Sequence, residues 1–306
     1  MTTQSYVLCP LTPMPLTATE PRSAQLASLS AHGFHRVRYW EWGDAANPRV
    51  AICVHGLARN GRDFDVLAEA LAATHRVLAV DMPGRGESEW LADPADYGFP
   101  TYLTTLTALI ARSGAEVVDW VGTSMGGLLG MAIAAQPRNP IARLVVNDVG
   151  PVIEPEALAR IGTYVGLDPT FATFEEIEGY IRSVSAPFGP LTDAQWRHLT
   201  VTNARQRPDG RWGLAYDPGI AVPFRASPAP ADLWGLWDAI RCPTLVLRGE
   251  RSDLLSAATA AAMRGRGPRP ELIEFAGIGH APTLLDPAQV DPVVAFLRTP
   301  LPAPRP

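Results

Sequence analysis

The chain has 306 residues, of which 47% are hydrophobic and 19% are charged. A chain of this length and composition can bury about three quarters of its unfolded surface, which excludes a disordered or low-complexity protein. The formal net charge is −5, and all 26 basic residues are arginine. Because nucleic-acid binding requires a cationic surface, this charge argues against a nucleic-acid partner.

The three cysteines, Cys9, Cys53 and Cys242, are too few and too scattered for a disulfide framework or a zinc cluster. No apolar run approaches the ~18 residues of a membrane span. The first thirty residues lack the basic start of a signal peptide. We therefore expect a cytoplasmic protein without a metal, a cofactor or a membrane partner.

Residues 1–30 are expected to form a loosely held N-terminal tail. Beyond them, short apolar runs rich in β-branched residues alternate with helical patterns, which predicts an α/β fold with a doubly wound parallel sheet. The expected strands are Arg49 to His55, Arg76 to Asp81, Val117 to Val121 and Arg143 to Asp148. The expected helices begin near Asn60, run from about Pro100 to Arg112, and run from Met125 to Ala135.

The alternation stops after Gly150. Residues 151–239 contain helical pieces broken by prolines, together with four tryptophans, and show no clean buried strand. Strand patterns return at Pro243 to Gly249 and Glu271 to Phe275, and a closing helix is expected from Asp286 to Arg298. We interpret residues 151–239 as a helical cap inserted into a core made of residues 31–150 and 240–306.

The sharpest chemical signal is a Gly-x-Ser-x-Gly motif from Gly122 to Gly126, placed between a predicted strand and a predicted helix. A nucleophile on such a sharp turn has strained torsion angles, and its neighbours two residues away must lack side chains. We therefore interpret Ser124 as a nucleophile.

A serine needs a base that takes its proton, and a base of this kind needs an acid that orients it. The best candidate base is His280, which lies in a glycine-flanked loop between the last strand and the last helix. Two aspartates follow strands, Asp253 after the strand that ends at Gly249 and Asp148 before the cap. The order Ser124, Asp253, His280 favours Asp253 as the acid, and Asp148 is the alternative.

These motifs resemble those of the α/β-hydrolase family over about Phe34 to Arg298. The resemblance rests on five motifs in order: His55-Gly56, the turn from Asp81 to Ser88, the elbow at Ser124, Asp253, and Gly279-His280. It implies an eight-stranded, mostly parallel sheet, a helical cap after the sixth strand, and no cofactor.

The resemblance also implies an oxyanion hole made by the backbone N–H groups of Leu57 and Met125, since acyl transfer needs such donors. His55 is then expected to brace its loop rather than act as a base. The turn from Asp81 to Ser88 lacks the spacing of a phosphate-binding loop and is expected to shape the pocket floor. Arg59 either faces the pocket, where it would bind an acidic group, or braces the loop, which we favour.

The sequence thus predicts a serine esterase that acts on a small-molecule ester through an acyl-enzyme. Three related reactions remain as alternatives: carbon–carbon bond hydrolysis of ring-cleavage products, lactone hydrolysis, and hydrolysis of hydroxyalkanoate oligomers. A ligand receptor built on a hydrolase scaffold is the alternative outside enzymes.

Overall fold

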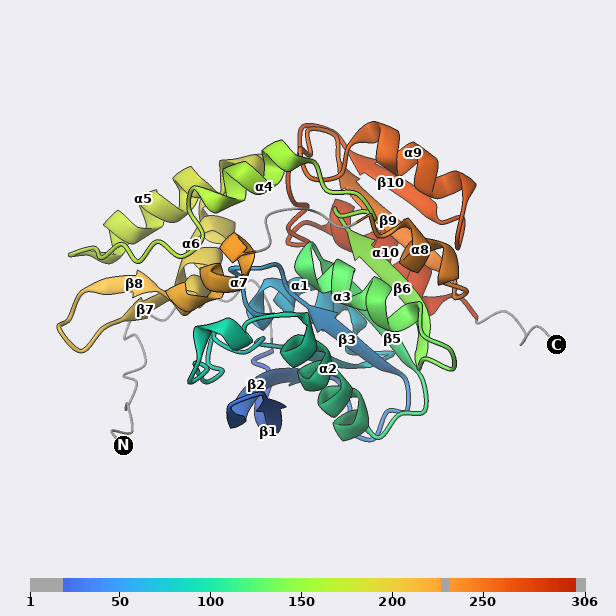
Figure 1. Ribbon diagram of the computed structural model, residues 1–306, viewed down its shortest axis with the longest axis horizontal. Helices are drawn as coiled ribbons and strands as arrows, with labels where there is room; N and C mark the ends of the chain where they lie inside the picture. Colours follow the sequence, from blue (N-terminus) through green and yellow to red (C-terminus); the bar gives the residue numbers. More distant parts are fainter. Residues whose placement is uncertain (1–18, 227–231, 301–306) are drawn as a thin grey trace.

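An open sheet of eight strands organises the part of the chain that the computed structural model describes, residues 19–226 and 232–300. Its order is β1-β2-β4-β3-β5-β6-β9-β10; β1 and β2 are antiparallel to their neighbours, and the remaining strands run parallel (Figure 1). The expected α/β-hydrolase sheet is therefore confirmed. The strands are β1 (Arg22–Ser30), β2 (Gly33–Trp42), β3 (Val50–Val54), β4 (Arg76–Val80), β5 (Val118–Thr123), β6 (Ile141–Asn147), β9 (Thr244–Gly249) and β10 (Glu271–Phe275).

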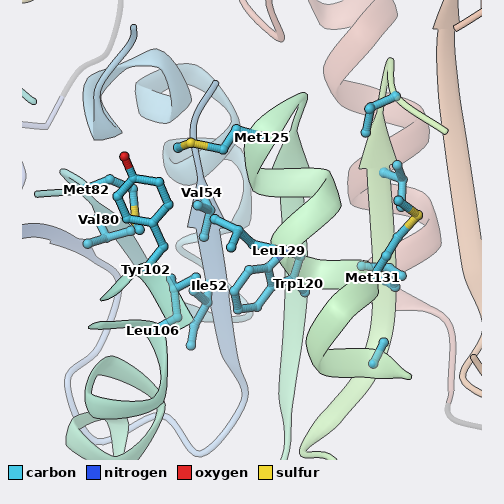
Figure 2. Close-up of a cluster of buried hydrophobic side chains, with 14 of the residues drawn as sticks. Ile52, Val54, Val80, Met82, Tyr102, Leu106, Trp120, Met125, Leu129 and Met131 are labelled. Carbon is cyan, nitrogen blue, oxygen red and sulfur yellow. The ribbon is translucent and has the colours of Figure 1, made fainter. Parts of the chain in front are cut away.

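Helices cover both faces of this sheet, because successive side chains of its central strands point to opposite faces. In β3, Ile52 and Val54 belong to one apolar cluster, whereas Ala51 and Cys53 belong to another. Figure 2 shows the first cluster, in which Trp120 of β5 packs near Leu129. The helices of that face are α2 (Phe99–Ser113), α3 (Met125–Ala134), α8 (Trp234–Ala239) and α9 (Ala257–Gly265); those of the other face are α1 (Asp65–Leu71) and α10 (Pro287–Arg298).

The predicted core elements are found with small shifts of their ends, except at the N-terminus. The expected tail of residues 1–30 is wrong for Arg22–Ser30, which forms the edge strand β1 and pairs with β2 from Arg22 to Ser30. This strand carries mostly small and polar residues with two isolated leucines and is mostly exposed, so it lacks the apolar run by which the buried strands are found. Residues 1–18 lie outside the described residues.

The cap extends over one end of the sheet (Figure 1). It contains α4 (Pro155–Gly162), α5 (Phe174–Val184), α6 (Asp193–Asn203), α7 (Ala221–Ala226) and a hairpin of β7 (Ala204–Gln206) and β8 (Trp212–Leu214). Short 3₁₀ turns occur at η1 (Gly61–Phe64), η2 (Pro94–Asp96), η3 (Ala186–Phe188) and η4 (Pro218–Ile220).

The predicted cap boundary at residue 239 is one helix too late. Helix α8 packs against α3, and its Trp237 is fully buried in the core cluster of that face. An aromatic side chain supplies a large buried apolar area wherever it packs, so tryptophans in the sequence did not distinguish cap from core.

Side-chain hydrogen bonds attach the cap to the core at separate points. Asn60 donates to the carbonyl of Thr202 in α6 at 2.8 Å, and Tyr97 donates to Asp217 at 2.6 Å. The cap is therefore fixed over the strand ends. No helix in the described ranges is both long enough and apolar enough to span a membrane.

Candidate active site

Ser124 lies on the sharp turn that joins β5 to α3, and its backbone has φ 53° and ψ −115°. A Cβ added to Gly122 would lie 2.2 Å from the carbonyl oxygen of Gly126, and one added to Gly126 would lie 2.0 Å from that of Val54. Neither distance is compatible with a side chain. The structure thus bears out the steric reason for the Gly-x-Ser-x-Gly pattern.

His280 joins this serine to a carboxylate. Its Nε2 lies 3.0 Å from Ser124 Oγ, and its Nδ1 lies 2.8 Å from Oδ2 of Asp148. The Asp148 side chain is fully buried, whereas that of His280 is 11% exposed. Ser124, His280 and Asp148 therefore form a continuous hydrogen-bonded chain with the geometry of a nucleophile, a base and an orienting acid.

The prediction that Asp253 is the acid beside His280 is wrong, because the carboxylate that contacts the imidazole is that of Asp148. Asp253 instead binds the guanidinium of Arg160 in α4, with Oδ1 2.9 Å from Nη2. Burial acts to raise the pKa of Asp253, but the hydrogen bonds and charge of Arg160 outweigh it and hold that pKa below its usual value. Asp253 thus forms an ion pair between the core and the cap.

A close approach at the end of β9 explains why His280 reaches Asp148. A Cβ on Gly249 would lie 2.4 Å from the carbonyl oxygen of Gly279 and 2.6 Å from that of Ile278. The loop between β10 and α10 that carries His280, called here the histidine loop, therefore passes directly over the end of β9 toward β6. The N–H of Gly249 also donates to Oδ1 of Asp148 at 2.9 Å, which fixes the carboxylate.

Asn147, the last residue of β6, holds the other side of the histidine loop. Its Nδ2 donates to the carbonyl of Pro282 at 2.8 Å and lies 3.0 Å from Oγ1 of Thr123. Its carbonyl accepts the N–H of Ser124 at 2.9 Å. This positioning residue was missed in the sequence, where only its place at a strand end marked it.

The turn that follows β3 carries Leu57, which lines the same cavity as Ser124, and His55 braces this turn as expected. Nδ1 of His55 lies 2.6 Å from the carbonyl of Gly56, and Nε2 accepts the N–H of Met82 at 2.9 Å. Burial lowers the pKa of His55 to about 3, so the ring is neutral. A Cβ on Gly56 would make only ordinary contacts, so close packing does not explain that glycine.

Arg85 is a second positioning residue that sequence reasoning missed. It is fully buried, and its Nε donates to the carbonyl of Leu57 at 2.8 Å while Nη1 donates to the hydroxyl of Tyr102 at 2.7 Å. A buried guanidinium is costly unless it is hydrogen-bonded, and here those bonds support the Leu57 turn. The available signal was an arginine between two glycines in the motif that runs from Asp81 to Ser88.

That motif is a structural turn, but it does not form the pocket floor. Asp81 accepts the N–H groups of Gly61 and Glu87 at 2.7 and 2.9 Å, and burial raises the pKa of Asp81 to about 6. None of the residues from Asp81 to Ser88 belongs to the described lining of the pocket. The turn acts behind the pocket wall, through Arg85.

A cavity of about 140 Å³ opens beside Ser124 and His280. Its walls come from both the core and the cap and are mainly apolar, with Ile161 and Val165 from the α4 region and Ile181 from α5. Arg59 also lines it, paired with Asp63 through a contact of 2.6 Å between Nη2 and Oδ1. Arg59 thus faces the cavity and also braces its turn through Asp63; that it binds an acidic group stays a prediction. Among the described residues, no three His, Cys, Asp or Glu side chains form a group that could hold a metal ion.

The fold and the arrangement around Ser124 are those typical of a class, the α/β hydrolases. The model of the alpha/beta hydrolase family matches residues 51–293, and the chain belongs to this family.

Relatives with known activities agree with this class. The chain is 49% identical to a 3-hydroxybutyrate-oligomer hydrolase of Cupriavidus necator over 282 residues, which is 89% of this chain and 96% of the relative. It is 29% identical to an esterase of Mycobacterium tuberculosis, over 74% of this chain and 73% of the relative. A solved α/β hydrolase from Novosphingobium aromaticivorans has 40% identity and a TM-score of 0.81, and the match covers 91% of this chain and 98% of that one. The protein is a hydrolase that acts on ester bonds.

The packing around the elbow generates a stability prediction. Gly126→Ala should lower the free energy of unfolding by about 1–3 kcal/mol, because its Cβ would collide with the β3 backbone, and should also displace Ser124. Chemical denaturation and ester turnover measure the two effects. Gly179→Ala in α5 is the matched control, since a Cβ there meets no atom within 4 Å; it should stabilise by about 0.5–1 kcal/mol. Equal stability of the two variants would contradict the steric argument.

Proposed function

We propose that Ser124, His280 and Asp148 are the catalytic triad of this hydrolase. The support is the hydrogen-bonded chain from Ser124 Oγ through both nitrogens of His280 to Asp148, together with the strained torsion angles of Ser124. Asp148 holds one imidazole nitrogen protonated and leaves the other free to accept the serine proton.

The reaction proceeds in two halves. His280 takes the proton of Ser124, whose oxygen attacks the ester carbonyl and forms a tetrahedral oxyanion. The carbon–oxygen bond of the ester then breaks, and the leaving alcohol takes the proton from His280. Water repeats the sequence on the acyl-enzyme, which releases the acid and restores Ser124.

The N–H groups of Leu57 and Met125 are our proposed donors to the oxyanion. Met125 begins α3, and the first amides of a helix have no intrahelical acceptor. Leu57 lines the cavity, and its carbonyl oxygen, in the next peptide along the turn, accepts from Arg85. Such donors act best when their orientation is fixed before the reaction.

We propose further that the substrates are short oligomers of 3-hydroxybutyrate. The observation that carries this proposal is the 49% identity to an enzyme of that name over nearly the full length of both chains. The cavity is consistent with it, because apolar walls with a few charged groups suit a chain that alternates methyl-bearing carbons with esters and ends in a carboxylate. A cytoplasmic location also belongs to the proposal and is supported by the free thiols of Cys53 and Cys242.

The substrate proposal predicts which ester is preferred. The purified enzyme should cleave 3-hydroxybutyrate dimer and trimer with a kcat/KM at least about tenfold above that for a simple alkyl ester of butyric acid, since one charged hydrogen bond is worth about that factor. Chromatographic measurement of released 3-hydroxybutyrate tests this. Cleavage of the simple ester without cleavage of the oligomers would contradict the substrate and leave the esterase class intact.

Ser124→Ala should reduce turnover of 4-nitrophenyl butyrate by about 10³-fold or more, because it removes the covalent step and leaves only residual catalysis. The same thermal unfolding midpoint as in the wild type would show that the fold is retained. A variant that keeps more than about a tenth of the activity would exclude Ser124 as the nucleophile.

Asparagine variants distinguish the roles of Asp148 and Asp253. Asp148→Asn should lower turnover of 4-nitrophenyl butyrate by about 10⁴-fold, because the amide favours the wrong imidazole tautomer. Asp253→Asn is the matched control and should cost less than about tenfold, since it weakens a partly exposed ion pair. The reverse ranking would return the role of the acid to Asp253.

A further inference from the structure

Two arginines enter the catalytic cavity from opposite sides. Arg59 belongs to the core turn that carries Leu57, and Arg160 belongs to cap helix α4. Together with Asp63, they are the arginine and carboxylate side chains of the described lining. The proposed reaction at Ser124 uses neither arginine.

Each guanidinium is oriented by a carboxylate that takes only part of its hydrogen-bonding capacity. Asp63 accepts from Nε and Nη2 of Arg59 at 2.8 and 2.6 Å, and Asp253 accepts from the same two atoms of Arg160. A guanidinium has five N–H donors in a fixed plane. Side-on pairing therefore leaves the two N–H groups of Nη1 on Arg59 without a partner among the described residues.

An aromatic side chain lies against each of the two guanidinium groups. The Arg59 guanidinium lies 5.5 Å from the ring centre of Phe188, which also lines the cavity. Tyr164, one helical turn beyond Arg160, lies against the Arg160 guanidinium. Burial raises the pKa of Tyr164 although the nearby arginine acts to lower it, so its hydroxyl stays protonated and is a further donor.

The side-chain stem of Arg59 lies near the reacting serine. A Cβ placed on Gly56 would be 3.6 Å from Cβ of Ser124 and 3.8 Å from Cγ of Arg59. The stem of Arg59 is thus separated from the nucleophile by about the width of one residue. A ligand group bound by the guanidinium would lie only a few bonds from a carbonyl attacked by Ser124.

A carboxylate enters a mainly apolar cavity only if charged hydrogen bonds compensate for its lost water. Guanidinium groups match its geometry, and such bonds are the strong ones. In a hydroxyalkanoate oligomer, the terminal carboxylate is the one charged group, and it is separated from the last ester oxygen by two carbons. We propose that Arg59 and Arg160 bind this carboxylate between core and cap, so that the enzyme cleaves the ester next to the carboxyl end.

This inference rests on the proposed function, and its test separates the two. The substrates are the 3-hydroxybutyrate dimer as the free acid and the same dimer with its carboxyl group converted to the primary amide. The ratio of the two kcat/KM values for cleavage of the internal ester isolates carboxylate recognition from chemistry. In the wild type, this ratio should be at least about ten, as expected for one lost charged hydrogen bond.

Arg59→Gln and Arg160→Gln should each lower this ratio about tenfold, mainly by raising KM for the free acid. Since Arg59→Gln leaves Asp63 unpaired, the double variant Arg59→Gln with Asp63→Asn removes both charges and should keep the low ratio. Arg182→Gln in α5 is the matched control, because Arg182 is a cap arginine of similar exposure that pairs with Glu178 outside the lining. It should keep the wild-type ratio.

Three results would overturn the inference. A wild-type ratio near one, or arginine variants that keep the wild-type ratio, would show that the carboxylate is not recognised there. A double variant that regains the wild-type ratio would show that the single variant acted through repulsion by Asp63. If the wild type cleaves 4-nitrophenyl butyrate but neither dimer, the oligomer function fails, and the carboxylate site fails with it.

Discussion

The hydrogen bond between Asp148 and His280 joins residues 132 positions apart in the chain, with the whole cap between them. It forms because β6, β9 and β10 are neighbours in the sheet and end at the same edge, so that the loop after β10 crosses the end of β9 to reach the end of β6. Parallel strands bring their carboxyl ends together, which is where α/β proteins build their sites. The cap therefore separates Asp148 from His280 along the chain but not in space.

Glycine contacts allow this arrangement. Gly249 lets the histidine loop cross the end of β9, and Gly122 with Gly126 lets β5 turn sharply into α3. At each of these glycines, main-chain atoms of a neighbouring segment lie where a side chain would otherwise be. The relative positions of Ser124 and His280 are therefore set by main-chain atoms. Main-chain positioning of this kind is stiff, as a site that relies on preorganised hydrogen bonds requires.

Much of this fold and site could be predicted from sequence because the signals were local. The buried strands are continuous apolar runs, and Ser124 and His280 lie in short glycine-flanked motifs. The acid could not be chosen in this way, because Asp148 and Asp253 both follow strands, and the choice depends on the path of the histidine loop over Gly249. Strand β1 was missed because its register is set by pairing with β2 and not by an apolar pattern of its own. The sequence likewise could not show which charged side chains line the cavity, because this depends on how the cap lies over the core.

Asp253 contributes to the cavity through Arg160 and not to the contacts of His280. Asp253, in the turn after β9, does not contact the histidine and instead binds Arg160 of the cap. The end of β9 and the turn after it thus supply the N–H of Gly249 to Asp148 and the carboxylate of Asp253 to Arg160, which lines the cavity.

The hydrogen bond between Asp148 and His280 is measured most directly by the proton NMR resonance of the His280 Nδ1–H, which a hydrogen bond to a buried carboxylate shifts far downfield. This resonance should be present in the wild type and in Asp253→Asn and should be lost or moved strongly upfield in Asp148→Asn. A resonance that survives in Asp148→Asn and disappears in Asp253→Asn would contradict the account and identify Asp253 as the partner of the histidine.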